Sequence, residues 1–440
     1  MINLITLIFS FAIISQPPTV LTLDEAMNIA FRGNLDIKIA EQNLLSAKAD
    51  YRSAISNFLP TLSFSSSYTR YPDEKTQTYY NFNPVTGQFT TEEIVSRPKA
   101  MHSSGFNLSW VLFTGGARWA NVNINSATVR MQEYQTSITQ ENIAYGTFSA
   151  YLGLIQAEKA KLIAEEALQQ ANENYKLTET MYQIGSSTNL DLLRAEVQVS
   201  QQEGNLIQAE NNLEAAKNSL CDILDIEKTE LTAVEPVFKE INLLSLDSCQ
   251  AIAINSPAVG MAQAGVDIAE AAKRTTISPF LPTVSLFGAY NWSGQNYEFD
   301  EPEYYGGVQF SWEIFSGTSR FHDYSSAGFQ HTASVLELSD AKQEILSTTE
   351  KDYLSVQSAI AFWETAVKTM QSAQQSYNLT LRMYENGMVT SLDLFEAQNT
   401  LEEARLAELS AYYSKYTALA KLLSDMGILK TTIINGGIYE

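Results

Sequence analysis

The chain has 440 residues, of which 45% are hydrophobic and 18% charged, and its formal net charge is −22. This apolar content excludes an intrinsically disordered chain. The negative charge argues against nucleic-acid binding, because phosphate groups require a surface rich in Lys and Arg, and it fits an acidic surface or an acidic passage that favours cations.

Residues 1–16 are predicted to be a secretory signal peptide. The run MINLITLIFSFAIIS contains no charged side chain. It is too short to cross a bilayer comfortably, and it is typical of the apolar region of an export signal. After this run there is no apolar stretch of about 18 residues, so no transmembrane helix is predicted.

The rest of the chain is predicted to consist of two structural repeats, 17–225 and 244–427. The segment NFLPTLSFSSSYT (57–69) resembles PFLPTVSLFGAYN (279–291), and LSWVLFTGGAR resembles FSWEIFSGTSR further along each repeat. Self-similarity of this length indicates a duplicated unit. The first repeat carries an additional polar, turn-rich segment, 71–100, which is predicted to be a long loop.

Each repeat contains two segments in which apolar and polar residues alternate, the period of a β-strand. Each has one apolar and one polar face, with aromatic residues near the ends, as in transmembrane β-barrels. An ordinary antiparallel sheet on a soluble core is the alternative. Four strands cannot close a barrel, so a membrane sheet requires two or three copies of the chain. The predicted strands are about 60–70, 102–114, 282–292 and 304–315.

Long helices are predicted between and after the strands, because no proline occurs from 99 to 235 or from 303 to 440. From Tyr353 to Tyr384 apolar residues follow the 3-4 spacing of a coiled-coil seam. The longer helices would each reach roughly 100 Å. The predicted helices are about 119–184, 188–225, 319–386 and 390–427.

Two similar turns are predicted to join these helices into antiparallel hairpins. The sequence YQIGSSTNLDLLRAE (182–196) resembles YENGMVTSLDLFEAQ (384–398). A glycine is typical of a helix C-terminus. Thr followed three residues later by Asp fits a capping box that begins the return helix.

No catalytic site is predicted. The three histidines, His102, His322 and His331, do not have metal-ligand spacing, and no nucleophile, zinc or phosphate-binding motif occurs. We therefore expect no enzyme activity, no cofactor and no metal site. Cys221 and Cys249 fit either a disulfide or two small buried side chains.

Taken in order, the FLPT strand entries, the SWxxFxxG strand exits and the twin GxxTxxD turns resemble the TolC-type outer-membrane efflux proteins over about residues 20–430. The resemblance implies a mixed α+β, mostly α protomer that forms a homotrimer. Its four transmembrane strands would contribute to a 12-stranded β-barrel, continuous with an α-helical barrel in the periplasm. Residues 226–243 would be an equatorial linker and 428–440 a C-terminal equatorial segment.

The resemblance also implies a function: an outer-membrane exit duct of a tripartite efflux pump or type I secretion system. Such a duct contacts outer-membrane lipid, docks through its hairpin tips onto a periplasmic adaptor protein, and is coupled by it to an inner-membrane transporter. The alternative is a periplasmic coiled-coil scaffold without a pore. The family's adaptor-docking positions correspond to Gly185, Thr188, Leu190, Asp191, Leu192, Gly387, Thr390, Leu392, Asp393 and Leu394.

The family further implies a gate at the periplasmic aperture, formed here by Asp393, Glu396, Tyr384 and Asp191. Asp393 and Glu396 share one helix face and would form an acidic ring that attracts cations. A cap and a solvated surface residue explain the same two side chains equally well. Val389 occupies the position at which the family's gate carries an arginine, so the latch is expected to differ.

Overall fold

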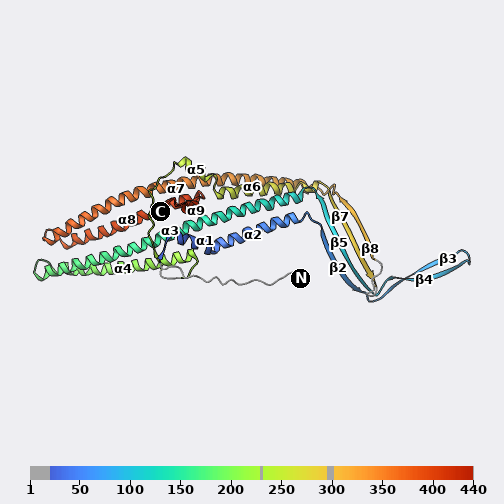
Figure 1. The fold of residues 1–440 in the computed structure, drawn as a ribbon, viewed down its shortest axis with the longest axis horizontal. Helices are drawn as coiled ribbons and strands as arrows, with labels where there is room; N and C mark the ends of the chain where they lie inside the picture. The colour runs from blue at the N-terminus through green and yellow to red at the C-terminus, as the bar shows by residue number, and fades with distance from the viewer. Residues whose placement is uncertain (1–19, 228–230, 295–301, 440) are drawn as a thin grey trace. The chain divides into compact units, whose positions relative to one another are not determined.

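A computed structural model describes residues 20–227, 231–294 and 302–439 (Figure 1). The predicted signal peptide, 1–16, lies outside the described residues. The chain divides into two compact units. Unit 1 comprises Met1–Leu44, Gln132–Met261 and Ser339–Glu440, and unit 2 comprises Leu45–Met131 and Ala262–Leu338. The fold is mixed and mostly helical, as predicted.

Unit 2 contains an antiparallel four-stranded sheet with the strand order β2-β5-β7-β8. Its strands are β2 (Thr61–Arg70), β5 (Ala100–Thr114), β7 (Thr283–Gly294) and β8 (Glu303–Ser311). Within the described residues, β2 and β8 are the two edges of this sheet, because each pairs with one neighbour only.

The register places apolar side chains in rows that cross all four strands. Phe64 pairs with Phe106, Phe106 with Tyr290, and Tyr290 with Tyr304. These four side chains are 58%, 43%, 46% and 79% exposed in the described chain. The predicted alternation of faces is therefore confirmed, and the apolar face is left uncovered within one protomer.

Two hydrogen bonds explain why both strand exits carry a tryptophan. The Trp110 indole N–H donates to the carbonyl of Phe58 at 2.8 Å, and Trp312 donates to Phe280 at 3.2 Å. Each bond joins a strand exit to the FLP segment that enters its partner strand, β2 for β5 and β7 for β8. The arginine that closes each motif also binds backbone: Arg320 donates to the Glu313 carbonyl at 2.6 Å, and Arg118 donates to that of Val111.

The prediction that 71–100 is a long loop is wrong. This segment forms a two-stranded antiparallel hairpin of β3 (Lys75–Asn83) and β4 (Gln88–Arg97). Gly87 has a φ of 66° in its turn. Threonines and aromatic residues favour the extended backbone, and Phe82 packs across the ladder on Phe89 with ring centroids 5.0 Å apart.

The last predicted strand is shorter than expected, because β8 ends at Ser311 rather than near 315. Ser311 pairs with Thr283, the first residue of β7. The residue before it is Pro282, which has no N–H to continue the ladder. Trp312 therefore has no strand partner within the described chain.

Four long helices occupy the ranges in which the sequence predicts them: α3 (Ala117–Gln183), α4 (Asn189–Leu224), α7 (Ser319–Glu385) and α8 (Ser391–Asp425). In Figure 1, α3 lies beside α4 and α7 beside α8, so each pair forms an antiparallel hairpin. The predicted seam is buried in part: Tyr377 and Tyr384 of α7 cluster with Leu394 and Leu401 of α8. No described helix combines the length and apolar character needed to cross a membrane.

Shorter elements complete the fold, and sequence reasoning did not anticipate the helices among them. They are β1 (Val20–Leu21), α1 (Leu23–Gly33), α2 (Leu35–Ser56), β6 (Thr232–Ala233), α5 (Leu246–Ala253), α6 (Pro257–Thr275), a 3-10 turn (Ser278–Phe280) and α9 (Leu429–Ile434).

The largest core cluster of unit 1 joins the middle of the helices to the segments at 226–243 and 428–440. The hydroxyl of buried Tyr151 donates to the Leu21 carbonyl at 2.7 Å and contacts that of Val234 at 2.6 Å. Phe238 forms a β-bridge with Tyr439. The linker and the C-terminal segment therefore pack together on the helices.

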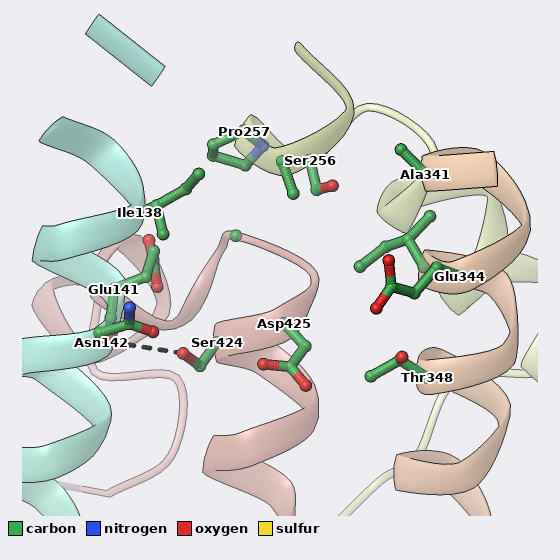
Figure 2. A pocket seen from close by; sticks show the side chains of 13 residues that line it. Ile138, Glu141, Asn142, Ser256, Pro257, Ala341, Glu344, Thr348, Ser424 and Asp425 are labelled. Atoms are coloured by element: carbon green, nitrogen blue, oxygen red, sulfur yellow. Dashed lines mark hydrogen bonds between the residues drawn. The ribbon is translucent and has the colours of Figure 1, made fainter. Parts of the chain in front are cut away.

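Both cysteines are buried free thiols. Cys221 belongs to the largest core cluster and Cys249 to a separate one. The disulfide alternative is therefore wrong. Unit 1 also holds a cavity of about 290 Å³ lined by α3, α6, α7 and α8 (Figure 2).

Candidate docking and gating site

The first hairpin tip is built by a glycine turn followed by a capping box, as predicted. Gly185 has a φ of 82°, which favours glycine. Thr188 caps α4: its hydroxyl lies 2.6 Å from Asp191 Oδ2 and accepts the Asp191 N–H at 3.2 Å. The Thr188 N–H donates to Asp191 Oδ2 at 3.1 Å, which completes the reciprocal pair.

The second tip repeats this local geometry. Gly387 has a φ of 68°. The Thr390 hydroxyl donates to Asp393 Oδ2 at 2.6 Å and its N–H at 2.8 Å, and the Asp393 N–H donates to the Thr390 hydroxyl at 3.4 Å. The two turns therefore satisfy the free N–H groups that begin α4 and α8 in the same way.

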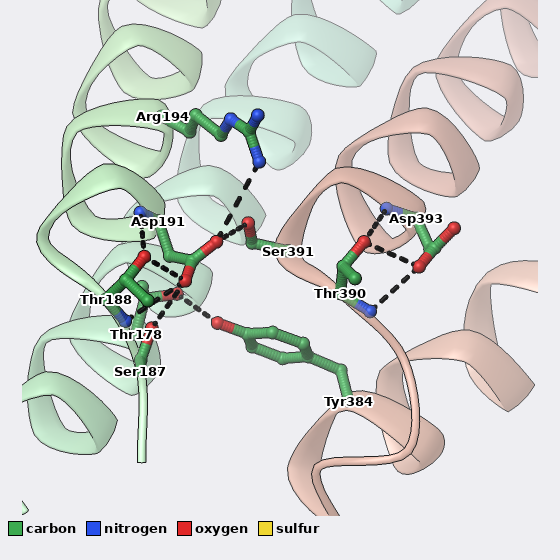
Figure 3. A network of polar contacts seen from close by, with 9 residues as sticks. All are labelled: Thr178, Ser187, Thr188, Asp191, Arg194, Tyr384, Thr390, Ser391 and Asp393. Carbon is green, nitrogen blue, oxygen red and sulfur yellow. Dashed lines mark hydrogen bonds and ion pairs between the residues drawn. The ribbon is translucent and has the colours of Figure 1, made fainter. Parts of the chain in front are cut away.

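The two tips are joined by a bond that the sequence motifs do not reveal (Figure 3). The hydroxyl of buried Ser391, at the start of α8, donates to Asp191 Oδ1 at 2.6 Å. Arg194 Nη1 lies 3.9 Å from the same carboxylate oxygen. Asp191 thus caps its own helix with one oxygen and binds the other hairpin with the other.

A second bond links the hairpins through the predicted gate tyrosine. The Tyr384 hydroxyl lies 2.8 Å from Thr178 Oγ1 of α3, and both side chains are buried. The Thr178 hydroxyl already donates to the Asn174 carbonyl at 2.9 Å. Because a hydroxyl carries one proton, Tyr384 must be the donor in this pair.

The hydrogen bonds to Asp191 determine its protonation. The Ser391 hydroxyl, followed by that of Thr188, lowers the pKa of Asp191 to about 2. The pKa of Asp393 is also lowered, by the Thr390 hydroxyl and then by its N–H. Both carboxyls are therefore ionised at neutral pH, and a charge-assisted bond joins the two hairpins.

The apolar residues predicted for docking do not all reach the surface. Leu394 is 0% exposed, because it packs in the α7–α8 seam, so its expected exposure is wrong. Leu192 is half-buried. Leu190 and Leu392 are exposed by 56% and 47%.

Two more exposed apolar side chains at the tips were missed by the sequence analysis: Ile184 (72%) and Met388 (70%). Each lies directly beside the turn glycine. That position is the signal that could have identified them, because a left-handed turn projects its neighbours away from the helix pair.

The other two predicted gate residues take no part in the two bonds just described between the hairpins. Asp393 and Glu396 are both exposed on α8. Val389 packs against the apolar cluster around Tyr384, so an apolar contact occupies the position of the expected arginine. The residues that the sequence analysis missed are Ser391 and Thr178, the actual partners of Asp191 and Tyr384.

Further polar pairs connect the hairpins away from the tips. Asn174 donates to Gln398 at 2.8 Å, Gln198 donates to Asn399 at 2.6 Å, and Gln202 donates to Glu402 at 2.7 Å. Leu177 and Met181 of α3 also pack against the apolar cluster that α7 and α8 share. The contact between the two hairpins is therefore partly polar and partly apolar.

Comparison with known proteins identifies the fold and the family. A family model described as outer membrane efflux protein matches residues 27–224 and 249–427. The chain belongs to the outer membrane efflux protein family. This confirms the resemblance to TolC-type proteins that the sequence motifs carry.

Individual relatives of this efflux protein are distant in sequence. It is 24% identical to the alkaline protease secretion protein AprF of Pseudomonas aeruginosa over 293 residues, which cover 64% of this chain and only 60% of AprF. It is 20% identical to the outer membrane protein TolC of Vibrio cholerae over 344 residues, covering 76% and 78% of the two chains.

A solved structure shows the same fold. The crystal structure of the outer membrane channel CmeC of Campylobacter jejuni matches this efflux protein with a TM-score of 0.78 at 18% identity, covering 95% of this chain and 86% of that one. Members of the family are channels and not enzymes, and they lie in the outer membrane with a periplasmic helical portion. The homologues thus indicate an outer-membrane efflux or secretion channel.

Proposed function

We propose that this protein is a homotrimeric exit duct. The observation that carries the proposal is the four-stranded sheet, which has two open edges and uncovered rows of apolar side chains. In lipid, an open edge would leave unsatisfied N–H and C=O groups. Three copies pairing β8 of one protomer with β2 of the next would close a barrel of 12 strands with its apolar rows towards lipid.

In this proposal each internal repeat contributes two strands and one helical hairpin. The helices of three copies surround a water-filled channel in the periplasm, and the segments at 226–243 and 428–440 form an equatorial belt. The duct is passive: it requires no cofactor, and the inner-membrane transporter drives the cargo. The family name supports efflux, and the name of AprF supports protein secretion.

The tips dock onto a periplasmic adaptor protein. The exposed apolar residues beside the two turns offer apolar area, and the capped turns hold that area in a fixed geometry. We infer that Leu190 and Leu392 contact the adaptor, together with Ile184 and Met388. Leu394 instead supports the tip from within, since it is buried.

The gate is held closed by the bonds between the hairpins of one protomer. Ser391–Asp191 and Tyr384–Thr178 must break for the hairpins to separate. In the trimer, Asp393 and Glu396 of the three copies surround the aperture and favour cations. Adaptor docking replaces the bonds between hairpins and dilates this aperture.

Single-channel conductance in a planar bilayer tests the proposal. The detergent-purified protein should give discrete, cation-selective steps that decrease when a multivalent cation is added on one side. A double variant, Asp393→Asn with Glu396→Gln, should lose that block, whereas the exposed control Glu385→Gln should retain it. Inserted protein that stays silent, even with Ser391→Ala, would instead favour the scaffold without a pore.

A further inference from the structure

The described methionines of this protein differ widely in exposure. Met388, in the turn of the second hairpin, is 70% exposed. Met101 on β5 is 39% exposed, whereas Met27 and Met426 are buried. Every other described methionine is half-buried. An oxidant in the surrounding solution therefore reaches the sulfur of Met388 more easily than that of any other described methionine.

The turn fixes the backbone on both sides of this side chain. The Gly387 N–H donates to the Tyr384 carbonyl at 2.9 Å. The Met388 N–H donates to the Met383 carbonyl, also at 2.9 Å. These two bonds cap the C-terminus of α7. The next residue, Val389, packs into the apolar cluster around Tyr384, whereas the exposed thioether of Met388 points away from that cluster.

Oxidation of Met388 should leave the fold intact. A sulfoxide is polar, so it disrupts packing when it forms inside a core. Met181 and Met370 pack against the cluster around Tyr384, and Met426 lies in another core cluster. Met388 contributes to none of the three apolar clusters that the described residues form. The oxygen added to its sulfur therefore lies in solvent.

The same exposure places Met388 on the surface that we propose for docking. The other apolar side chains of that surface are Ile184, Leu190 and Leu392, and none of them contains sulfur. Burial of a flexible thioether against a partner is favourable. Burial of a sulfoxide oxygen costs free energy unless a hydrogen-bond donor meets it. Met388 is thus the member of this surface whose polarity an oxidant changes.

We propose that Met388 is a site of reversible oxidation that weakens docking of the adaptor. The oxidant is a hydroperoxide. The sulfur lone pair attacks the terminal oxygen, an S–O bond forms as the O–O bond breaks, and the other oxygen takes the proton and leaves as water or an alcohol. The sulfur is oxidised and the peroxide reduced by the same electron pair. A sulfoxide reductase reverses the step: a pair of thiols becomes a disulfide, and the oxygen leaves as water.

This inference rests on the proposed docking of the hairpin tips. In the oxidised protein the second tip loses apolar area, while the first tip keeps that of Ile184. Docking is therefore weakened and not abolished. An adaptor that is already bound covers the sulfur of Met388 and slows its oxidation.

Peptide mass mapping of the detergent-solubilised full chain after treatment with hydrogen peroxide tests the site. A sulfoxide should form at Met388 well before it forms at Met383, which is half-buried near the end of α7. The helix content, measured by circular dichroism, should be unchanged when Met388 alone is oxidised. Oxidation of Met388 no faster than that of Met383 would overturn the proposal.

The consequence is tested by binding of the purified periplasmic adaptor encoded beside this protein, measured before and after oxidation. Oxidation should weaken binding to the wild type about tenfold, and a sulfoxide reductase with a thiol should restore it. Each variant is compared with its own untreated sample. Met388→Leu should show no loss on oxidation, whereas the control Met101→Leu should lose affinity as the wild type does.

Two results would overturn the proposal: an unchanged affinity of the oxidised wild type, or an equal loss in Met388→Leu. Failure of the untreated wild type to bind the adaptor is a different result. It would refute the proposed docking itself, and this inference with it.

Discussion

Substitution of Ser391 by alanine should open the tip without unfolding the hairpins. Ser391 donates its hydroxyl to Asp191 across the two hairpins, whereas the capping box of Asp191 with Thr188 lies entirely within the first hairpin. The variant therefore removes a bond between hairpins and leaves both helix caps intact. In the proposed duct, we expect a higher open probability and unchanged helix content.

The size of the effect follows from the geometry of the bond. The 2.6 Å distance is that of a hydroxyl donating to a carboxylate, and bonds to charged groups contribute about 1.5–3 kcal/mol. The Asp191 side chain is 20% exposed and keeps its bond to Thr188. We therefore expect a loss near the lower limit, about 1.5 kcal/mol per protomer, or about a tenfold shift towards unlinked hairpins.

The pH dependence of this link has a defined sign. The pKa of Asp191 in the folded protein is about 2, below the ordinary value of 3.8. The stabilisation is therefore complete above the ordinary pKa and is lost as the pH falls through the folded pKa. The link should stay formed at neutral pH and weaken only in the window between those two values.

Single-channel recording of open probability at pH 7 is the assay. The matched control is Ser187→Ala, which removes a hydroxyl from the same carboxylate, 3.3 Å away, but from within the first hairpin. Open probability should rise for Ser391→Ala and stay close to the wild-type value for Ser187→Ala. Equal behaviour of the two variants would refute the role of the bond between hairpins.

Three further predictions concern other parts of the molecule. The folded pKa of Asp352 is raised to about 7, so the contribution of this carboxyl to stability falls as the pH rises from about 4 towards 7. Asp352→Asn should remove this fall and raise the thermal midpoint at pH 8. A lower thermal midpoint of the variant at pH 8 would contradict the raised pKa of Asp352. Val308→Lys, on the apolar face of β8, should destabilise the folded protein in lipid by about 2–4 kcal/mol and abolish heat-resistant oligomers on gels. The control Gln309→Lys, on the opposite face, should retain these oligomers. Equal losses in the two variants would argue against a lipid-facing row. Leu394→Ala should lower the free energy of unfolding, measured in urea, by about 2–5 kcal/mol. Leu392→Ala should leave the unfolding midpoint unchanged and weaken pull-down of the adaptor. A Leu394→Ala variant as stable as the wild type would show that the α7–α8 seam does not depend on this side chain.

Much of the fold follows from short-range patterns. The 3-4 spacing before Tyr384 and the alternation around Phe106 predict helix and strand because each pattern reports which face of a single element is apolar. The capping box of Thr188 and Asp191 at the start of α4 was predictable for the same reason, since all of its atoms lie within one helical turn. These features depend on few backbone units and hardly on the rest of the chain.

Features that depend on two distant segments were mispredicted or missed. The burial of Leu394 follows from the approach of α7 to α8, and a Leu at this point of the motif is equally compatible with exposure. The segment 71–100 contains strand-forming residues among polar ones, and its pairing as a hairpin is visible only when the two halves are aligned in space. β8 is short because its only partner among the described residues begins at Thr283.

The sequence by itself determined the mostly helical architecture, the two turns, their caps and the resemblance to an efflux channel. Tertiary structure alone decided that Asp191 meets Ser391, 200 residues away along the chain, and that Leu394 is buried between α7 and α8. The reason is physical. A cap or a periodicity is set by neighbours one turn apart, whereas a contact between helices depends on the packing of every side chain that fixes the distance between them.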